Sequence, residues 1–305
     1  MRDTQSGLEI TVFLCGDVMT GRGIDQILPH PGDLHIHEQY VRDAKRYVNL
    51  AEERHGLIPG PVGFSYIWGD ALGELERVSP DVRIVNLETS ITSRDDYWKG
   101  KGINYRMNPA TIACLTAADI DVCSLANNHV LDWGYNGLKE TLRTLEKAGI
   151  NTAGAGSDLK SAVAPTVIEA PGKGRVIVFS CGLASSGIPS SWAAAENKAG
   201  VNLLPDLSDK VVLGIGNRIR MIKRQGDIIV VSIHWGGNWG YEIAREQCNF
   251  AHGLIDTAGA DIIHGHSSHH VMGIEVYRDR PIMYGCGDFI NDYAGIGGYE
   301  TFREI

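Results

Sequence analysis

Short runs of apolar residues recur along the chain, and each run is bounded by turn-forming residues. Most are rich in Val and Ile and lack the apolar/polar alternation of a half-exposed strand, a pattern typical of strands covered on both faces. Strands are predicted on this basis at residues 10–15, 82–87, 120–125, 176–180, 228–233, 262–264 and 281–284. We therefore expect a sheet core that is covered from both sides.

Segments between these runs have the three- and four-residue apolar spacing of amphipathic helices. The spacing predicts helices over residues 110–118, 137–148, 211–224 and 247–258. Strands alternating with helices indicate an α/β layered fold. Residues 29–63 are polar with a helix-like middle, and we expect them to form a lid over the site; residues 185–207 are expected to form a long loop. We find no repeat or linker, so residues 1–305 are predicted to form a single domain.

Metal-binding residue types follow six of the predicted strands, usually beside a glycine. In an open α/β sheet, ligands bind outside the carboxyl ends of the strands, so these side chains are expected to meet. Carboxylate, amide and imidazole groups without a thiolate suit divalent Mn, Zn, Fe or Co. Six such groups are too many for one tetrahedral ion and suit a pair of ions about 3.5–4 Å apart. The predicted metal ligands are Asp17, Glu88, Asn128, His234, His266 and His269.

Further residues near these strand ends are candidates for catalysis or substrate binding. His129 is a candidate for catalysis, and Asp132 is expected to orient it or to cap the following helix. His270 is a second imidazole beside the last ligand. Lys99, Lys101 and Arg106 form either an anion clamp over the metals or a solvated basic loop. Aromatic side chains after His234 either line a substrate groove or simply pack; the candidates are Trp235 and Trp239.

Composition and charge narrow the function further. The net charge of −9 argues against general binding to nucleic acid or to anionic membranes. Two carboxylates facing two divalent ions would nevertheless make the site cationic, which favours an anionic or carbonyl substrate. The six cysteines form no C-x-x-C pair and are expected to be buried thiols in a reducing compartment. Neither a signal peptide nor an apolar span of about 18 residues is present, so we expect a cytoplasmic protein.

The chain resembles a known family. The motifs GDVM, NLE, ANNHVLDWG, HWGGNWG, GHSSHH and YGCGDF are similar, in this order, to those of the CapA family of poly-γ-glutamate capsule synthesis proteins. The domain of that family is similar to the calcineurin-like metallophosphoesterases. The resemblance runs from about residue 8 to residue 302. It implies a four-layer α/β/β/α sandwich in which Asp17 is the first metal ligand, Glu88 bridges two metals, and Asn128 is the amide ligand of the second.

The sequence departs from the pattern of calcineurin-like enzymes in several places. Met19 stands where the first motif usually has a histidine, which removes one expected ligand. Ser268 replaces a common proline, and Asp288 stands where asparagine is common. Relatives usually continue beyond the last motif, so a C-terminal segment is expected to be missing.

Three functions are compatible with these residues. The first is a hydrolase of phosphoesters or of peptide-like substrates such as poly-γ-glutamyl chains, in which a metal-bound hydroxide attacks and His129 protonates the leaving group. The second is a metal-dependent Cα-epimerase of the kind that acts on lasso peptides. The third is a non-catalytic polymer-binding module of capsule synthesis. The sequence does not specify an oligomeric state.

Overall fold

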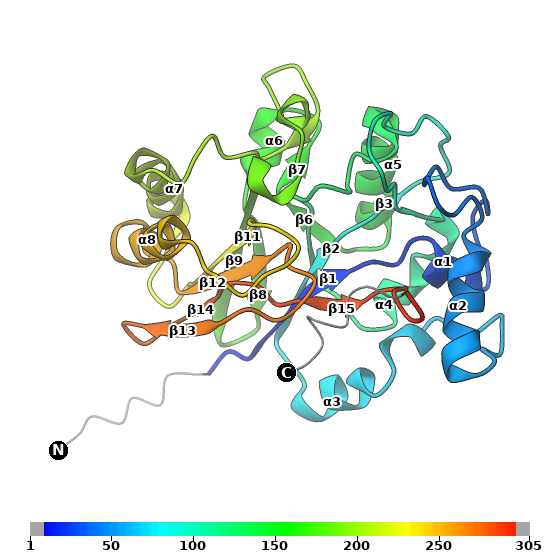
Figure 1. Ribbon diagram of the computed structural model, residues 1–305. Helices are drawn as coiled ribbons and strands as arrows, with labels where there is room; N and C mark the ends of the chain where they lie inside the picture. The colour runs from blue at the N-terminus through cyan, green and yellow to red at the C-terminus, as the bar shows by residue number, and fades with distance from the viewer. Residues whose placement is uncertain (1–8, 297–305) are drawn as a thin grey trace.

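The Val- and Ile-rich runs form two β-sheets in the computed structural model, which describes residues 9–296 (Figure 1). The first sheet has five strands in the order β15-β1-β2-β5-β6, and all of its neighbours are parallel. Its strands are β1 (Val12–Val18), β2 (Val82–Leu87), β5 (Val122–Ser124), β6 (Asn151–Ala153) and β15 (Asp288–Ile290).

The second sheet has six strands in the order β13-β14-β12-β11-β9-β8. Its four central strands are parallel, and an antiparallel strand closes each edge. The strands are β8 (Thr166–Ala170), β9 (Gly174–Gly182), β11 (Ile228–His234), β12 (Ile262–His266), β13 (Ile274–Tyr277) and β14 (Arg280–Met283). Seven of the parallel strands in the two sheets are the predicted runs, with boundaries moved by a few residues, whereas β6 and β15 were not predicted.

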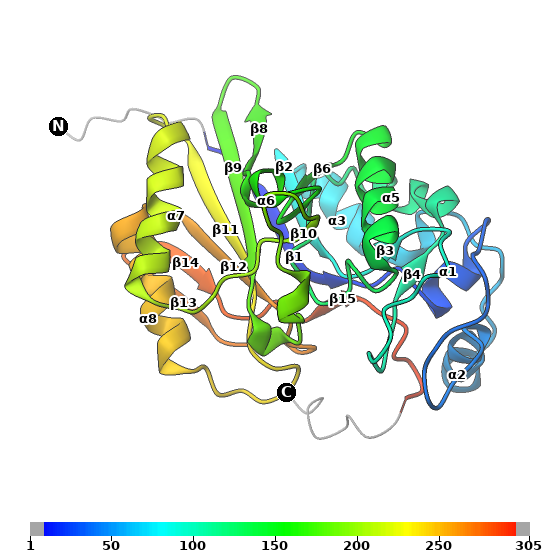
Figure 2. The same ribbon diagram turned by 90° about the horizontal axis from the view of Figure 1, so that it is seen from above.

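Three groups of buried side chains give the molecule its layers. Val and Ile side chains of both sheets, including Ile84 and Val178, form a core between the sheets. Neighbouring positions such as Val85 point the other way and pack under α5 (Gly134–Lys147) and α4 (Ala113–Thr116). The opposite face of the second sheet packs under α7 (Asp209–Ile222) and α8 (Arg245–Gly253). Figure 2 shows the resulting α/β/β/α order, which confirms the predicted metallophosphoesterase-like fold.

Shorter elements complete the described chain. Two small ladders pair β3 (Ser90–Ile91) with β4 (Arg106–Met107) and β7 (Ala155–Gly156) with β10 (Gly200–Val201). The remaining helices are α1 (Gly23–Ile27), α2 (Lys45–His55), α3 (Ala71–Val78) and α6 (Leu159–Val163), with 3-10 turns η1 (Tyr66–Trp68), η2 (Pro109–Thr111), η3 (Ala184–Ser186) and η4 (Ser190–Trp192).

Two predicted helices differ from the structure. Residues 110–118 form η2 and α4 rather than one helix, because the Asn108 side chain accepts a hydrogen bond from the Ala110 amide and starts a 3-10 turn there. The helix predicted at 247–258 begins at Arg245 and ends in a π-helical turn, η5 (Leu254–Ala258). Residues 29–63 contain α2 as their helical middle, and residues 185–207 form irregular chain with short turns and β10.

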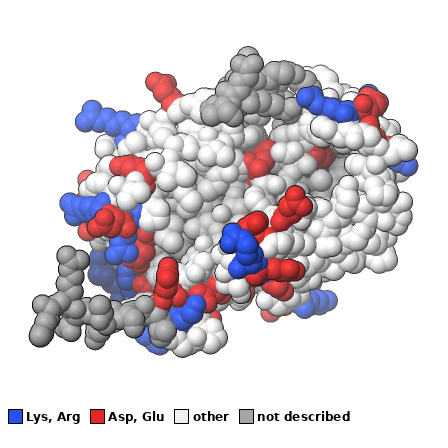
Figure 3. Space-filling model, turned by 90° about the horizontal axis from the view of Figure 1, so that it is seen from below, with Lys and Arg blue, Asp and Glu red and all other residues white. Residues whose placement is uncertain are grey.

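Charge is distributed without a field of one sign on the face drawn in Figure 3, where acidic and basic side chains are interspersed among uncharged residues. Within the described chain, no helix combines the length and apolar character that a membrane crossing requires. The six cysteines are free thiols, and four of them are buried.

Candidate metal centre

The two predicted carboxylate ligands lie together at the ends of β1 and β2. Asp17 and Glu88 are essentially inaccessible to solvent. The Asn86 side chain donates to Asp17 Oδ1 at 2.7 Å and to Glu88 Oε2 at 3.1 Å, so one amide holds both groups. Burial and the charge of Asp288 raise the pKa of Asp17 to about 7. Burial and the charge of Asp17 likewise raise the pKa of Glu88 well above its usual value.

The second sheet brings two imidazoles to the same place. His234 and His266 end the neighbouring strands β11 and β12 in direct register, and their Nδ1 atoms lie 2.8 Å apart. Asn128 Oδ1 lies 3.0 Å from His234 Nε2. Burial lowers the pKa of both histidines well below the usual value, which favours the neutral form that binds metals. Ligand atoms of Asp17, His234 and His266 all lie within 4.8 Å of one another.

A buried chain of hydrogen bonds fixes the tautomer of His266. His264 Nε2 faces the Cys15 carbonyl at 2.8 Å and must therefore carry its proton. Burial lowers the pKa of His264 to about 4, and its Nδ1 lies 3.1 Å from Ser232 Oγ, whose hydroxyl donates to Ser124 Oγ at 3.0 Å. Ser232 Oγ then accepts from His266 Nε2 at 2.8 Å. This arrangement leaves the lone pair of His266 Nδ1 directed at the site.

His269 and Asp288 form a second group around Asp17. Ligand atoms of these three residues lie within 4.8 Å of one another. His269 Nδ1 and Asp288 Oδ1 are 2.7 Å apart. Burial opposes protonation of His269, but the hydrogen bond and charge of Asp288, together with Asp17, outweigh it and raise the pKa. Asp17 therefore belongs to both candidate groups, whereas the resemblance assigned the bridging role to Glu88.

His129 lies beside these groups with a carboxylate behind it. Its Nδ1 is 2.6 Å from Asp132 Oδ2, and its Nε2 is 3.7 Å from Glu88 Oε1. Burial lowers the pKa of His129 to about 4 despite the charge of Asp132. Asp132 also accepts from the Tyr105 amide at 2.7 Å. Of the two predicted alternatives for Asp132, the structure shows the one in which it orients His129.

The predicted anion clamp is only partly near this site. Lys101 donates to the Asp132 carboxylate and to the Asn128 carbonyl, and its Nζ lies 3.3 Å from His129 Nδ1. Lys99 is exposed. Arg106 pairs with Asp95 at 2.6 Å, and its guanidinium lies over a tryptophan ring. The contacts of Arg106 are those of a structural residue, so the structure does not support its role in the clamp.

The predicted aromatic residues have different positions. Trp235 is a core residue with 2% of its surface exposed; it stacks on Tyr284 and donates to the Tyr284 carbonyl at 2.9 Å. Its prediction as a substrate-binding residue is therefore corrected. Trp239 is half-buried and lies 5.5 Å, between ring centres, from His269. His270 packs against the same indole ring at 6.3 Å. Trp239 and His270 thus border the candidate centre.

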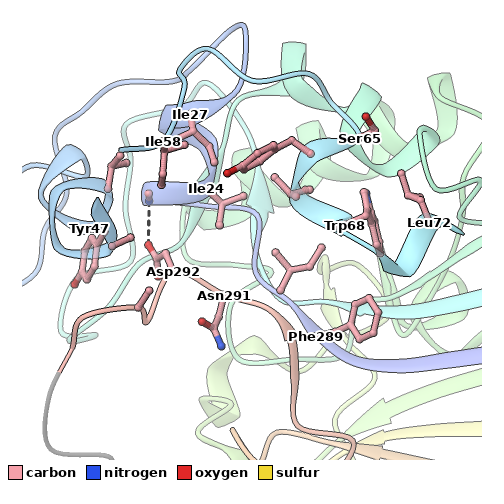
Figure 4. A pocket seen from close by; sticks show the side chains of 18 residues that line it. Ile24, Ile27, Tyr47, Ile58, Ser65, Trp68, Leu72, Phe289, Asn291 and Asp292 are labelled. Carbon is pink, nitrogen blue, oxygen red and sulfur yellow. Dashed lines mark hydrogen bonds between the residues drawn. The ribbon is translucent and has the colours of Figure 1, made fainter. Parts of the chain in front are cut away.

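A cavity of about 830 Å³ lies between α1, α2, η1 and the end of β15 (Figure 4). Its walls are mainly apolar, and none of the predicted site residues lines it. Asn291 at its edge donates to Asp288 Oδ2 at 3.0 Å. The cavity is therefore next to the candidate centre but is not itself the centre.

Two residues of the centre were absent from the predicted set. Asn86 was overlooked because an asparagine inside an apolar strand has no ligand spacing of its own. Asp288 follows a strand end and a glycine, as Asp17 does, and this repeated Gly-Asp pattern is the signal that could have identified it. Asn127 holds the loop by accepting from the His129 and Val130 amides at 3.1 and 3.0 Å.

The sequence as a whole matches known proteins. A profile of the family described as bacterial capsule synthesis protein PGA_cap matches residues 11–293. The chain belongs to the PGA_cap family. A probable polyglutamine synthesis accessory protein of Mycobacterium tuberculosis is 50% identical over 295 residues, which cover 96% of this chain and 77% of the relative.

Two CapA proteins are more distant relatives of this PGA_cap chain. The capsule biosynthesis protein CapA of Bacillus anthracis is 25% identical over 93% of this chain and 60% of its own length. The PGA biosynthesis protein CapA of Bacillus subtilis is 32% identical over 68% of this chain and 52% of its own length. The chain thus spans little more than half of either CapA protein. The matches confirm the resemblance to the CapA family.

Proposed function

We propose that this PGA_cap protein is a metal-dependent hydrolase of phosphoester or peptide-like substrates, with γ-glutamyl chains as the leading substrate class. The observation that carries the proposal is the convergence of carboxylate, amide and imidazole ligands from both sheets on one buried place. The names of the relatives, which refer to polyglutamine and PGA synthesis, support an anionic peptide polymer as substrate.

The residues present fit a pair of divalent ions. Asp17 Oδ2 is buried and has no hydrogen-bond partner among residues 9–296, and an oxygen of this kind is stabilised by a cation. The donor set contains oxygen and neutral imidazole nitrogen, which suits Mn, Zn, Fe or Co. The residues that would hold the ions are Asp17, Glu88, Asn128, His234, His266 and His269. Bound ions would supply Lewis-acid activation of water and of the substrate oxygen.

His129 and Asp132 would move the proton. Because Asp132 accepts from His129 Nδ1, the neutral imidazole has its lone pair on Nε2, which faces Glu88 and the candidate ligands. Nε2 can then take a proton from the attacking water and deliver it to the leaving group. Lys101 would help to fix Asp132 in the orientation that this requires.

The surrounding chain would support this chemistry. We propose that residues 29–63 act as a lid within a single domain. Two buried side chains of this segment, Glu38 and Tyr47, bind Arg22, which also pairs with Asp292 close to the site. The free, mostly buried thiols are compatible with the cytoplasm, where we place the protein.

The test combines metal analysis with substrate assays on purified protein. We expect bound divalent ions by elemental analysis and hydrolysis of an aryl phosphoester or of a short γ-linked glutamate oligomer. His129→Asn should keep the metals but lose most of the activity, whereas His234→Ala should lose both. His252→Asn is the matched control, because His252, on α8, pairs with Glu275 of β13 rather than with the site.

The other two functions are outcomes of the same experiment. Incorporation of solvent deuterium at Cα of a peptide without hydrolysis would replace the hydrolase with an epimerase. A folded protein that binds no divalent ion would contradict both enzymatic functions and indicate a polymer-binding module.

A further inference from the structure

The candidate centre contains more buried negative charge than its side chains balance. Asp288 acts electrostatically on both Asp17 and Glu88, so three carboxylates share one buried place. The cationic side chains in the vicinity, the half-buried Lys101 and the buried Arg22, are each paired with carboxylates of their own. Since buried charges in proteins are paired or bind metals, the excess indicates more than one cation.

Asp17 is placed to serve two cations. β1 lies beside β15 with Asp17 directly opposite Asp288, so the two carboxylates are cross-strand neighbours. One group of ligand atoms joins Asp17 to His234 and His266, and the other joins it to His269 and Asp288. Asn86 occupies Asp17 Oδ1, whereas Oδ2 is buried without a hydrogen-bond partner in the described chain.

We propose that Asp288 is a direct ligand of a second cation, which it holds together with Asp17 and His269, and that Asp17 is shared by both cations. This inference rests on the proposed metal-dependent function and assigns a residue to it. Met19, the residue that occupies the usual histidine position, offers only a thioether, which is a soft and weak ligand for Mn or Zn. Asp288 would supply the missing ligand from the other end of the chain.

An alternative role for Asp288 is to orient His269 without touching the metal. The distance of 2.7 Å between His269 Nδ1 and Asp288 Oδ1 allows that role. The two roles respond differently to Asp288→Asn. The asparagine oxygen can still accept from an imidazole N–H, so orientation would survive, but the negative charge that binds a cation would be lost.

The experiment titrates metal-free wild type, Asp288→Asn and Asp256→Asn with Mn²⁺ by calorimetry. Asp256→Asn removes the same charge from an exposed position on η5 and serves as the control. We expect two equivalents to bind to wild type and control. In Asp288→Asn the first should bind normally, and the dissociation constant of the second should rise more than about 100-fold, which exceeds the effect of losing a group that only orients a ligand. The electron paramagnetic resonance signal of a coupled Mn pair should disappear in that variant alone.

Each other result overturns the inference. Two equivalents in Asp288→Asn, with the affinity of the second unchanged or weakened by about 100-fold or less, would show that Asp288 only orients His269. Binding of a single equivalent to wild type would contradict the second cation, but it would still be compatible with a one-metal enzyme. No binding in wild type would contradict the proposed function itself. Circular dichroism melting curves of the three proteins ensure that a loss of binding is not a loss of fold.

Discussion

Replacing Ser232 with alanine removes one hydroxyl group that three buried side chains share. Ser232 Oγ lies 2.8 Å from His266 Nε2, 3.1 Å from His264 Nδ1 and 3.0 Å from Ser124 Oγ. The serine and both histidines are inaccessible to solvent or nearly so. The hydroxyl therefore acts both on the stability of the sheet-to-sheet contact and on the tautomer of a candidate metal ligand.

The size of both effects follows from these contacts. Ser124 keeps its other partner, Ser180, at 2.5 Å, but each of the two imidazoles loses a partner in a place that water does not reach. An unsatisfied buried polar group costs about 1–3 kcal/mol, so we expect Ser232→Ala to lower the free energy of unfolding by about 2–6 kcal/mol. Loss of a group that orients a metal-binding histidine should weaken metal affinity about 10- to 100-fold.

Urea unfolding of the metal-free protein measures the first effect, and calorimetric titration with Mn²⁺ measures the second. Ser180→Ala is the matched control, because it removes a hydroxyl from the same buried chain without touching either histidine. Ser180→Ala should lower the free energy of unfolding by about 1 kcal/mol and leave the affinity for Mn²⁺ unchanged. If Ser232→Ala bound Mn²⁺ within twofold of wild type, the argument that this chain of hydrogen bonds sets the His266 tautomer would be refuted.

Three further predictions test other parts of the structure. Asp132→Asn should lower kcat on the order of 100-fold with little change in KM, because the catalytic imidazole loses its orienting carboxylate; steady-state kinetics measures this. Gly16→Ala should yield little folded protein, because a Cβ there would lie 1.8 Å from the Gly287 carbonyl oxygen. Expression yield and circular dichroism measure the amount of folded protein. The hydrogen bond with Arg175 lowers the pKa of Asp227, although burial opposes this shift. Asp227→Asn should therefore lower the free energy of unfolding by about 1–3 kcal/mol at pH 7, as measured by urea unfolding. That difference should shrink as pH falls below about 3.9 and through the lower pKa of the folded state, because protonation then removes the same interaction from wild type.

The apolar runs were sufficient to predict the layered fold. A strand that is buried on both faces is an unbroken apolar run, and it can be identified without knowing which strands lie beside it. Ile84 and Val85 illustrate this: they are neighbours in one strand, one facing the other sheet and the next facing the helices. The extent of the helix at residues 110–118 was not predictable in the same way. A local cap at Asn108 decides that stretch, and apolar spacing does not record it.

Charge pairing distinguishes the candidate cations that reach the centre from those that do not, and charge pairing is a tertiary property. The sequence presents Lys99, Lys101 and Arg106 as one basic loop, but the fold gives each a different environment. Lys101 binds the carboxylate that orients His129, whereas Arg106 is held by Asp95.

Asp288 illustrates the opposite case, in which the fold brings together residues that the sequence does not relate. It is 271 positions from Asp17 in the sequence, and no spacing rule relates the two. They become neighbours only because β15, one of the last described elements, adds to the free edge of β1 in parallel. That strand places a third carboxylate in a region from which water is excluded, where its charge must be balanced. The edge strand β15 therefore changes the chemistry of the centre as well as the width of the sheet. Because Asp288 comes from this strand, the two-metal assignment depends on the number of cations that Asp288→Asn binds.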